Sequence, residues 1–189
     1  MQSKPILMID VDGVLADFVS PIVKHANWLT AEELTPDQIT QWDIQAMYPE
    51  LPADDLYAPC MKKGFCEGLE EYRGAGDALQ ELRQHFTVVA CTTPFWRSPY
   101  WHYERTQWLM RRGFQSNQII FTADKGLVRG AALIDDKVDN VLDWERSNRP
   151  GLPILWKQPW SGTLPSPAHG STVQAGSWEA LMHVLNIRG

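Results

Sequence analysis

The chain has 189 residues, of which 44% are hydrophobic and 21% are charged, and its formal net charge is −6. This length suits one core domain with a small insertion, and the negative charge argues against a groove for a nucleic-acid polymer, which requires a basic stripe. The three cysteines have no metal-type spacing, and their odd number predicts no disulfide framework. The N-terminal apolar run is short and no run reaches transmembrane length. We therefore expect a cytoplasmic protein with no membrane partner.

The first predicted element is a strand, residues 6–9, which ends in Asp10, Asp12 and Gly13. Its apolar run is continuous, which is typical of a buried parallel strand. Two carboxylates this close repel each other unless a proton or a cation lies between them, and Gly13 lets the chain turn away with no Cβ in the way. The stretch favours a metal-assisted site in which one carboxylate is a nucleophile, although an ordinary Asx-type turn would use the same residue types.

The next part of the chain, residues 18–72, contains no convincing strand. A helical pattern follows Phe18 and continues to about residue 29, and Thr35 and Pro36 have the residue types of an N-cap and a first helical position. Several prolines further on indicate short helices and turns. We therefore expect a helical insertion, called the cap below.

Strands and helices alternate in the remainder of the chain. The expected strands are 87–92, 118–122, 131–134 and 153–156, the expected helices are 77–86, 101–112 and 177–187, and residues 161–176 are expected to form a loop. Such alternation predicts a Rossmann-like α/β fold, a parallel sheet with helices on both faces. The expected division is a core domain, residues 1–17 and 73–189, with the cap, residues 18–72, inserted after the first strand.

Polar side chains stand at or just past the ends of four predicted strands. Because the carboxyl ends of parallel strands share one edge of the sheet, these groups should converge. They are Asp10 and Asp12, Thr92 and Thr93, Lys125, and Asp135 and Asp136. Each group alone has an ordinary explanation as a turn, a helix cap or a solvated lysine, but together they supply what a phosphoryl-transfer site needs.

On these residues the sequence resembles the haloacid dehalogenase superfamily of phosphatases. The four matching motifs are Asp10-x-Asp12-Gly13, Thr92, Lys125 and Asp135-Asp136. Within the superfamily the sequence is most similar to the 5′(3′)-deoxyribonucleotidases, through segments 12–18, 91–94, 124–125 and 133–136.

The resemblance implies a role for each catalytic residue. Asp10 would attack phosphorus and carry an aspartyl-phosphate, and Asp12 would protonate the leaving oxygen and then activate water. Thr92 would hydrogen-bond the phosphoryl oxygens. Lys125 would balance their charge and hold Asp10.

The resemblance also implies Mg²⁺ as the cofactor. Its ligands would be the Asp10 carboxylate, the Asp12 backbone carbonyl and a carboxylate of the fourth motif, with waters completing an octahedron. Spacing from Lys125 favours Asp136 as the direct ligand, while Asp135 is either a direct ligand or one step removed. The presence of Asp12, which the dehalogenating branch lacks, favours phosphate-ester hydrolysis.

The cap would close over the site and line a substrate pocket. Phe18 matches a family residue of the nucleobase pocket, Trp42 lies about where the family has a pocket tryptophan, and Phe65 is a further candidate. The alternative is that these aromatic residues only pack the cap onto the core. The full expected substrate-binding set is Phe18, Trp42, Phe65, Thr92, Thr93 and Lys125.

The predicted function is Mg²⁺-dependent hydrolysis of a small phosphate monoester, a (deoxy)nucleoside monophosphate, with dUMP and dTMP as expected substrates. Three alternatives stay open: a phosphatase for another small ester such as a sugar phosphate, a receiver-like phosphoacceptor, and an inactive binding module. A receiver should have its phosphoacceptor aspartate near the third strand and no helical insertion. The sequence leaves the oligomeric state open between monomer and homodimer.

Overall fold

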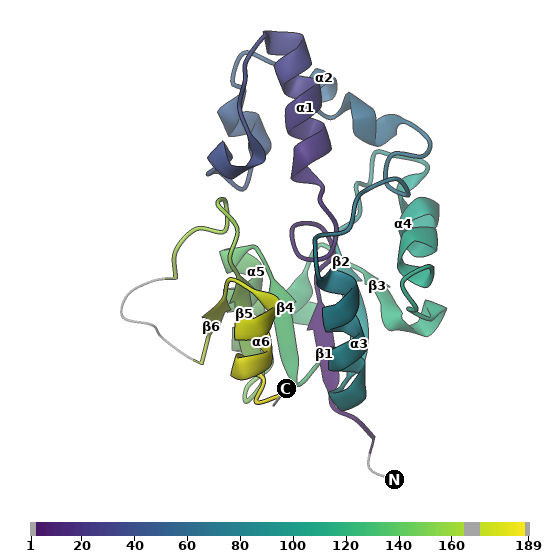
Figure 1. Cartoon of the computed structure of the whole chain (residues 1–189), viewed down its shortest axis with the longest axis vertical. Helices are drawn as coiled ribbons and strands as arrows, with labels where there is room; N and C mark the ends of the chain where they lie inside the picture. Colours follow the sequence, from purple (N-terminus) through teal and green to yellow (C-terminus); the bar gives the residue numbers. More distant parts are fainter. Residues whose placement is uncertain (1–2, 165–170, 188–189) are drawn as a thin grey trace.

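A six-stranded sheet forms the centre of the computed structural model, which describes residues 3–164 and 171–187 (Figure 1). The strands lie in the order β3-β2-β1-β4-β5-β6, and all neighbouring pairs are parallel. Their bounds are β1 (Ile6–Ile9), β2 (Thr87–Thr92), β3 (Ile119–Phe121), β4 (Ala132–Asp135), β5 (Leu152–Trp156) and β6 (Val173–Ala175). The chain builds outward from β1 on one side and then restarts with β4 on the other, so a crevice is expected at the carboxyl ends of β1 and β4.

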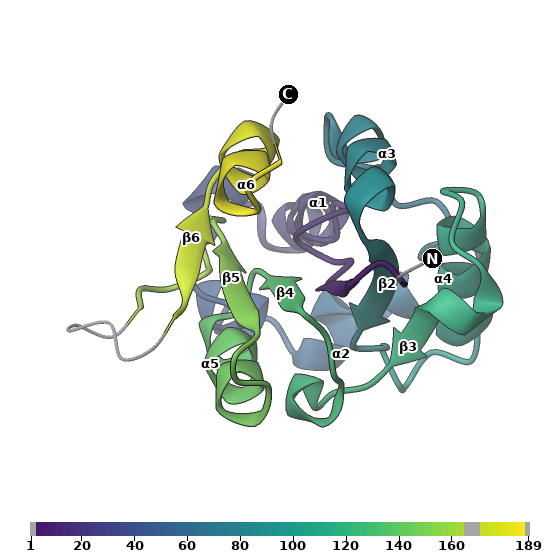
Figure 2. The same ribbon diagram turned by 90° about the horizontal axis from the view of Figure 1, so that it is seen from below.

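Helices cover both faces of the sheet, as a buried parallel sheet requires. In β1, Leu7 and Ile9 pack into one core and Met8 into another, which is the period of two that a strand imposes. The first core receives α3 (Ala75–His85), α4 (Trp101–Met110) and α6 (Trp178–Val184), and the second receives α5 (Val138–Ser147). Figure 2 shows α3 and α6 on one side of the strands and α5 on the other.

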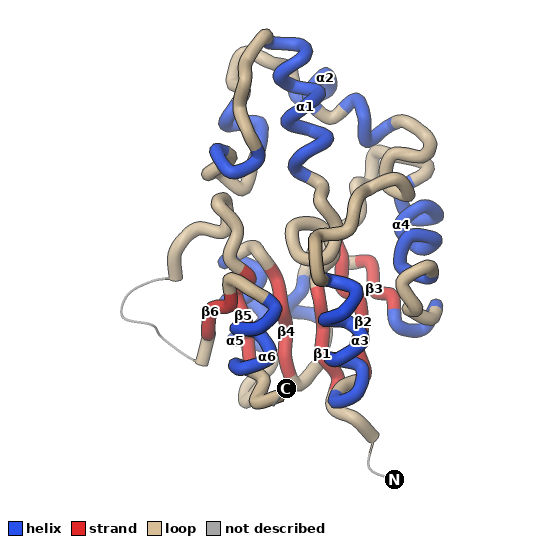
Figure 3. Tube along the Cα trace, viewed as in Figure 1, coloured by secondary structure: helices blue, strands red, loops and turns tan. Residues whose placement is uncertain are grey.

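The cap lies beyond the carboxyl ends of the strands, and between residues 19 and 61 it consists of helices and loops (Figure 3). Its elements are α1 (Val19–Thr30), η1 (Pro36–Gln38), η2 (Ile44–Met47), α2 (Ala53–Leu56) and η3 (Ala58–Met61). Their apolar side chains form a separate hydrophobic cluster, which Trp101 and Trp160 join from outside the insertion. Two further 3₁₀ helices, η4 (Ser116–Gln118) and η5 (Lys125–Leu127), flank β3.

The predicted α/β fold with a helical insertion after the first strand is confirmed, but one α-helix and one strand were not predicted. Helix α5 follows Asp135-Asp136 directly, where only a turn or cap was expected. The expected loop 161–176 contains β6; residues 165–170 of that loop lie outside the described part. A three-residue edge strand is too short to show a period in the sequence. The exact division into residues 1–17 and 73–189 against 18–72 stays a prediction.

The three cysteines, Cys60, Cys66 and Cys91, are free and buried. None of the helices in the described ranges is long and apolar enough to cross a membrane.

Candidate active site

The centre of the site is a buried lysine that holds two carboxylates. Lys125, at the start of η5, donates from Nζ to Asp10 Oδ1 (2.8 Å), to Asp135 Oδ2 (2.9 Å) and to the backbone carbonyl of Cys91 (2.5 Å). Burial alone lowers the pKa of Lys125, but the carboxylates of Asp10 and Asp135 outweigh it and raise that pKa above its ordinary value. The lysine is therefore a fixed positive charge between β1 and β4, at the predicted crevice.

Asp10, Asp135 and Asp136 form a buried group that can hold a metal ion. One carboxylate oxygen of each residue lies within 4.8 Å of the others. Burial raises the pKa of Asp10 to about 7, although Lys125 opposes this, and burial with the neighbouring carboxylates raises the pKa of Asp136 well above its usual range. Crowded, desolvated carboxylates of this kind are stabilised by a cation. Because all the donor atoms are oxygens, the group fits a hard divalent cation.

Hydrogen bonds distinguish Asp135 from Asp136. Both oxygens of Asp135 accept donors, from the Lys137 backbone N–H (2.9 Å), the Asn140 side chain (3.1 Å to each oxygen) and Lys125. Among the described residues only Trp160 donates to Asp136, from Nε1 to Oδ2 (2.5 Å). Asp136 is therefore the freer of the two to coordinate a metal ion.

Gly13 leaves room for the Asp136 carboxylate. Its φ is +78°, and a Cβ added at this position would overlap the carboxylate of Asp136. The carbonyl of Gly13 accepts a hydrogen bond from Gln158 Nε2 (2.7 Å), so the segment after β5 also reaches this turn. The glycine of the first motif is thus required both by backbone conformation and by space.

Asp12 has a cation of its own, which the sequence did not indicate. Arg105 on α4 has no exposed surface, and its Nη2 donates to Asp12 Oδ1 at 2.5 Å. The guanidinium lies between the rings of Trp101 and Trp108, 5.3 and 5.5 Å from their centroids. Burial raises the pKa of Asp12, and Arg105 opposes that shift. A mid-helix arginine has no sequence pattern that would mark it as a partner of a distant aspartate.

The two threonines after β2 have different environments. The Thr93 hydroxyl lines the cavity described below and donates to the Thr122 carbonyl (3.1 Å). The Thr92 hydroxyl is buried and has no hydrogen-bond partner within the described chain. Thr92 has no exposed surface and does not line the cavity, so its expected hydrogen bond to a phosphoryl oxygen stays a prediction.

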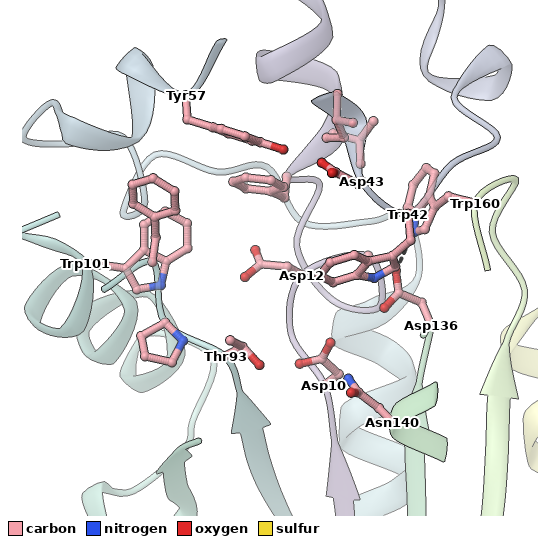
Figure 4. A pocket seen from close by; sticks show the side chains of 16 residues that line it. Asp10, Asp12, Trp42, Asp43, Tyr57, Thr93, Trp101, Asp136, Asn140 and Trp160 are labelled. Atoms are coloured by element: carbon pink, nitrogen blue, oxygen red, sulfur yellow. Dashed lines mark hydrogen bonds between the residues drawn. The ribbon is translucent and has the colours of Figure 1, made fainter. Parts of the chain in front are cut away.

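A cavity of about 290 Å³ extends from these carboxylates to the cap (Figure 4). Asp10, Asp12 and Asp136 lie at one end of it, and Asp43 and Tyr57 of the cap lie at the other. Between the two ends the walls are largely aromatic, formed by Phe18, Trp42, Phe95, Trp101 and Trp160.

Two of the three expected pocket aromatics line this cavity. Phe18 and Trp42 do, and Trp42 is 51% exposed with Lys137 Nζ 3.7 Å from its ring centroid. Phe65 is not in the wall; its ring packs edge-on behind Phe18, with centroids 6.3 Å apart. Sequence reasoning missed Trp101, at the start of a helix, and Trp160, in a loop, because neither position has a period or motif that points to a ligand.

Comparison with known proteins identifies the family. The family described as "5' nucleotidase, deoxy (Pyrimidine), cytosolic type C protein" matches residues 4–184. The chain is 32% identical to the human cytosolic-type 5′(3′)-deoxyribonucleotidase over 141 residues, which are 69% of this chain and 70% of that protein. It is 29% identical to the 5′(3′)-deoxyribonucleotidase of Clostridium acetobutylicum over 149 residues, 76% and 79% of the two chains.

Solved structures show the fold to be that of haloacid dehalogenase-like hydrolases. A protein from Burkholderia xenovorans described as such a hydrolase aligns over 100% of both chains with a TM-score of 0.65 and 13% identity. A Bacillus subtilis protein of the same description, in a structure bound to magnesium, aligns over 98% of this chain and 100% of that one with a TM-score of 0.59 and 15% identity. With a family match that spans nearly the whole sequence and a buried aspartate cluster at the expected sheet edge, the chain belongs to the 5′(3′)-deoxyribonucleotidase family of nucleotide phosphatases.

Proposed function

We propose that this protein hydrolyses deoxynucleoside monophosphates to nucleoside and phosphate, with Mg²⁺ as its cofactor. The observation that carries the proposal is the pair of carboxylates at the floor of the cavity, Asp10 and Asp12, each held by a different buried cation. Two carboxylates in separate environments suit two roles, because a nucleophile and an acid–base group need different protonation behaviour.

In this proposal Asp10 attacks phosphorus and carries the phosphoryl group, while Lys125 orients it and opposes the rise of its pKa. Asp12 gives a proton to the leaving oxygen and then takes one from the water that hydrolyses the intermediate. Thr92 and Thr93 face the phosphoryl oxygens. Asp10, the Asp12 carbonyl and Asp136 would hold Mg²⁺, which would supply charge stabilisation for the phosphoryl group, and Asp135 orients Lys125.

The aromatic walls support a nucleotide over a sugar phosphate. A nucleobase stacked on Phe18 and Trp101 gains about 1–3 kcal/mol by analogy with bases bound on aromatic side chains, whereas a sugar phosphate has no flat apolar part to offer. An apolar pocket rejects an added hydroxyl by only roughly 10²-fold, so ribonucleotides should be slower substrates and not excluded ones. A cytoplasmic location is part of the proposal; one human relative is described as cytosolic type and another as mitochondrial.

Phosphate release from a panel of deoxynucleotides, ribonucleotides, sugar phosphates and p-nitrophenyl phosphate, with and without chelator, tests the proposal. We expect deoxynucleotides to have the highest kcat/KM and all activity to need the divalent ion. Sugar phosphates that outperform every nucleotide would refute the substrate assignment. Unchanged activity after exhaustive chelation would refute the metal.

A further inference from the structure

The segment directly after β5 contacts two parts of the candidate metal site. Gln158 Nε2 donates to the Gly13 carbonyl (2.7 Å), and Trp160 Nε1 donates to Asp136 Oδ2 (2.5 Å). Neither donor belongs to the phosphoryl-transfer motifs, and the proposed reaction uses Trp160 only as a wall of the cavity. An indole N–H therefore lies against a carboxylate that is available to a metal ion, and its role there is unassigned.

The Trp160 indole is fixed from two directions. Its ring is 7% exposed and packs with the hydrophobic cluster of the cap, on the cap side of Asp136 (Figure 4). Its backbone lies in a turn that the buried Ser161 hydroxyl closes, by donating to the Trp156 carbonyl (2.8 Å) and accepting the Gln158 N–H (2.8 Å). An indole N–H is a donor only, so it can satisfy a carboxylate oxygen but cannot itself bind a cation.

The two oxygens of Asp136 consequently differ. Oδ2 takes the indole proton and lies against Gly13, because a Cβ built on that glycine would overlap Oδ2 but would stand 3.4 Å from Oδ1. Among the residues that the structure describes, no group donates a hydrogen bond to Oδ1. Since Asp10 and Asp135 each bring a carboxylate oxygen close to Asp136, Oδ1 is the Asp136 oxygen left free for a shared cation.

We propose that Trp160 is a positioning residue for the metal ion: it occupies Oδ2 of Asp136, so that this carboxylate binds the cation through Oδ1 alone. This role, which rests on the proposed Mg²⁺-dependent function, favours Mg²⁺ over Ca²⁺. Mg²⁺ demands near-ideal octahedral geometry with short bonds, whereas Ca²⁺ accepts more oxygens in a looser arrangement and often binds both oxygens of one carboxylate. An Asp136 carboxylate with a single free oxygen therefore suits the smaller ion.

Trp160→Phe keeps an aromatic ring in the cap cluster and removes only the N–H side of the indole. We expect its dissociation constant for Mg²⁺, measured by isothermal titration calorimetry without substrate, to rise about tenfold, as is typical when the hydrogen-bond partner of a metal ligand is lost. The constant for Ca²⁺ should stay the same or fall, because Oδ2 becomes available to that ion. An unchanged or increased preference for Mg²⁺ over Ca²⁺ would overturn the proposal.

Trp144→Phe is the matched control. Trp144 is also buried, but its Nε1 has no hydrogen-bond partner within the described chain, so the same substitution removes no hydrogen bond there. We expect the preference for Mg²⁺ over Ca²⁺ to be unchanged in this variant, even where the smaller ring lowers the melting temperature. A loss of preference as large as in Trp160→Phe would show that any lost indole has this effect, and would overturn the proposal.

Nuclear magnetic resonance of the unaltered, isotope-labelled protein tests the same contact without depending on a variant. The Trp160 indole N–H should keep its downfield chemical shift and its slow exchange with solvent when Mg²⁺ is added, because the ion takes Oδ1 and the hydrogen bond to Oδ2 of Asp136 survives. If the ion takes Oδ2 instead, the N–H loses its acceptor, its resonance moves upfield and its exchange accelerates. That result would overturn the proposal.

The outcomes separate the role of Trp160 from the function on which it rests. If the unaltered protein binds Mg²⁺ but Trp160→Phe keeps the same preference over Ca²⁺, the role of Trp160 fails and the Mg²⁺-dependent reaction stands. If calorimetry detects no binding of Mg²⁺ to the unaltered protein, the proposed cofactor fails, and the role of Trp160 fails with it.

Discussion

Asp10 and Asp12 stand one residue apart, and each carboxylate has a different cation. Lys125 reaches Asp10 from the start of η5, and Arg105 reaches Asp12 from the middle of α4. Without these partners two buried carboxylates would repel each other and shed their charge by taking up protons. The separate cations orient the two carboxylates independently, which a nucleophile and an acid–base group require.

Replacing Arg105 tests whether that orientation matters to the reaction. We expect Arg105→Met to lower kcat roughly tenfold to a hundredfold, within the contribution of general acid–base catalysis, with KM nearly unchanged because Arg105 is absent from the cavity wall. Arg105→Lys, which can restore the charge, should recover part of kcat. Steady-state kinetics measures both. A rise in KM with constant kcat would contradict a role through Asp12.

The space that Gly13 leaves for Asp136 should matter for metal binding. We expect Gly13→Ala to displace the Asp136 carboxylate, because its Cβ would occupy the same space, and so to abolish the rise in melting temperature caused by Mg²⁺. Gly64→Ala is the matched control: Gly64 also has a positive φ (+88°), but nothing lies within 4 Å of its added Cβ. Differential scanning fluorimetry with and without Mg²⁺ compares the two. Equal Mg²⁺ stabilisation in both variants would show that Gly13 is only a turn residue.

Helix α4 packs on the core and also contacts the segment through which the chain leaves the cap. The buried Glu104 carboxylate accepts the backbone N–H groups of Gly64 (2.6 Å), Cys66 (3.1 Å) and Glu67 (3.4 Å). Arg105, the next residue, holds Asp12. One helix therefore fixes both an end of the cap and the Asp12 carboxylate.

The contribution of the Glu104 hydrogen bonds to the free energy of unfolding can be measured. We expect Glu104→Gln to lower the free energy of unfolding by about 1.5–3 kcal/mol, because the amide cannot accept from all three donors and charged hydrogen bonds are worth about that much. Glu81→Gln on α3 removes an exposed carboxylate that contacts His85 and Gln84 of the same helix, and should change stability by less than about 0.5 kcal/mol. Urea titration measures both. Equal losses would mean that the cap segment does not depend on Glu104.

The elements that the sequence predicts well are those whose pattern comes from burial. The continuous apolar runs of β1, β2 and β4 are buried on both faces, and Thr35 and Pro36 do begin η1. Strand β6 has only three residues at the edge of the sheet, so its sequence is under weaker constraint. The motif residues converge because parallel strands share an edge, but the position of Arg105 or Asp43 depends on how α4 and the cap pack, which no local pattern encodes.

At the scale of the whole molecule, the chain has a large core around the sheet and a smaller one in the cap. Cys60 and Cys66 belong to the cap cluster, and Cys91 belongs to the sheet. Burial raises the pKa of all three thiols to about 12. None of these thiols should react with a thiol reagent unless the hydrophobic cluster around it opens by local unfolding. The labelling rate of each cysteine therefore measures how often its own cluster opens.

We expect Cys60 and Cys66 to be labelled faster than Cys91, because the smaller cluster has less apolar area to hold it closed. Timed exposure to a thiol reagent, followed by mass spectrometry of peptides, gives the three rates. Phosphate with Mg²⁺, bound between cap and core, should slow the two cap cysteines most. Identical rates at all three positions would show that the cap and core open only together.

We expect Asp10 to become covalently phosphorylated, which peptide mass spectrometry of an acid-quenched reaction can detect. Asp12→Asn should accumulate the intermediate, because it lacks the base that activates water for the second step. After a brief reaction with a deoxynucleotide and Mg²⁺, we predict a phosphoryl group on Asp10 in this variant and none in the double variant with Asp10→Asn. A phosphoryl group on Asp135 or Asp136, or hydrolysis that proceeds in Asp10→Asn, would contradict the role of Asp10 as nucleophile.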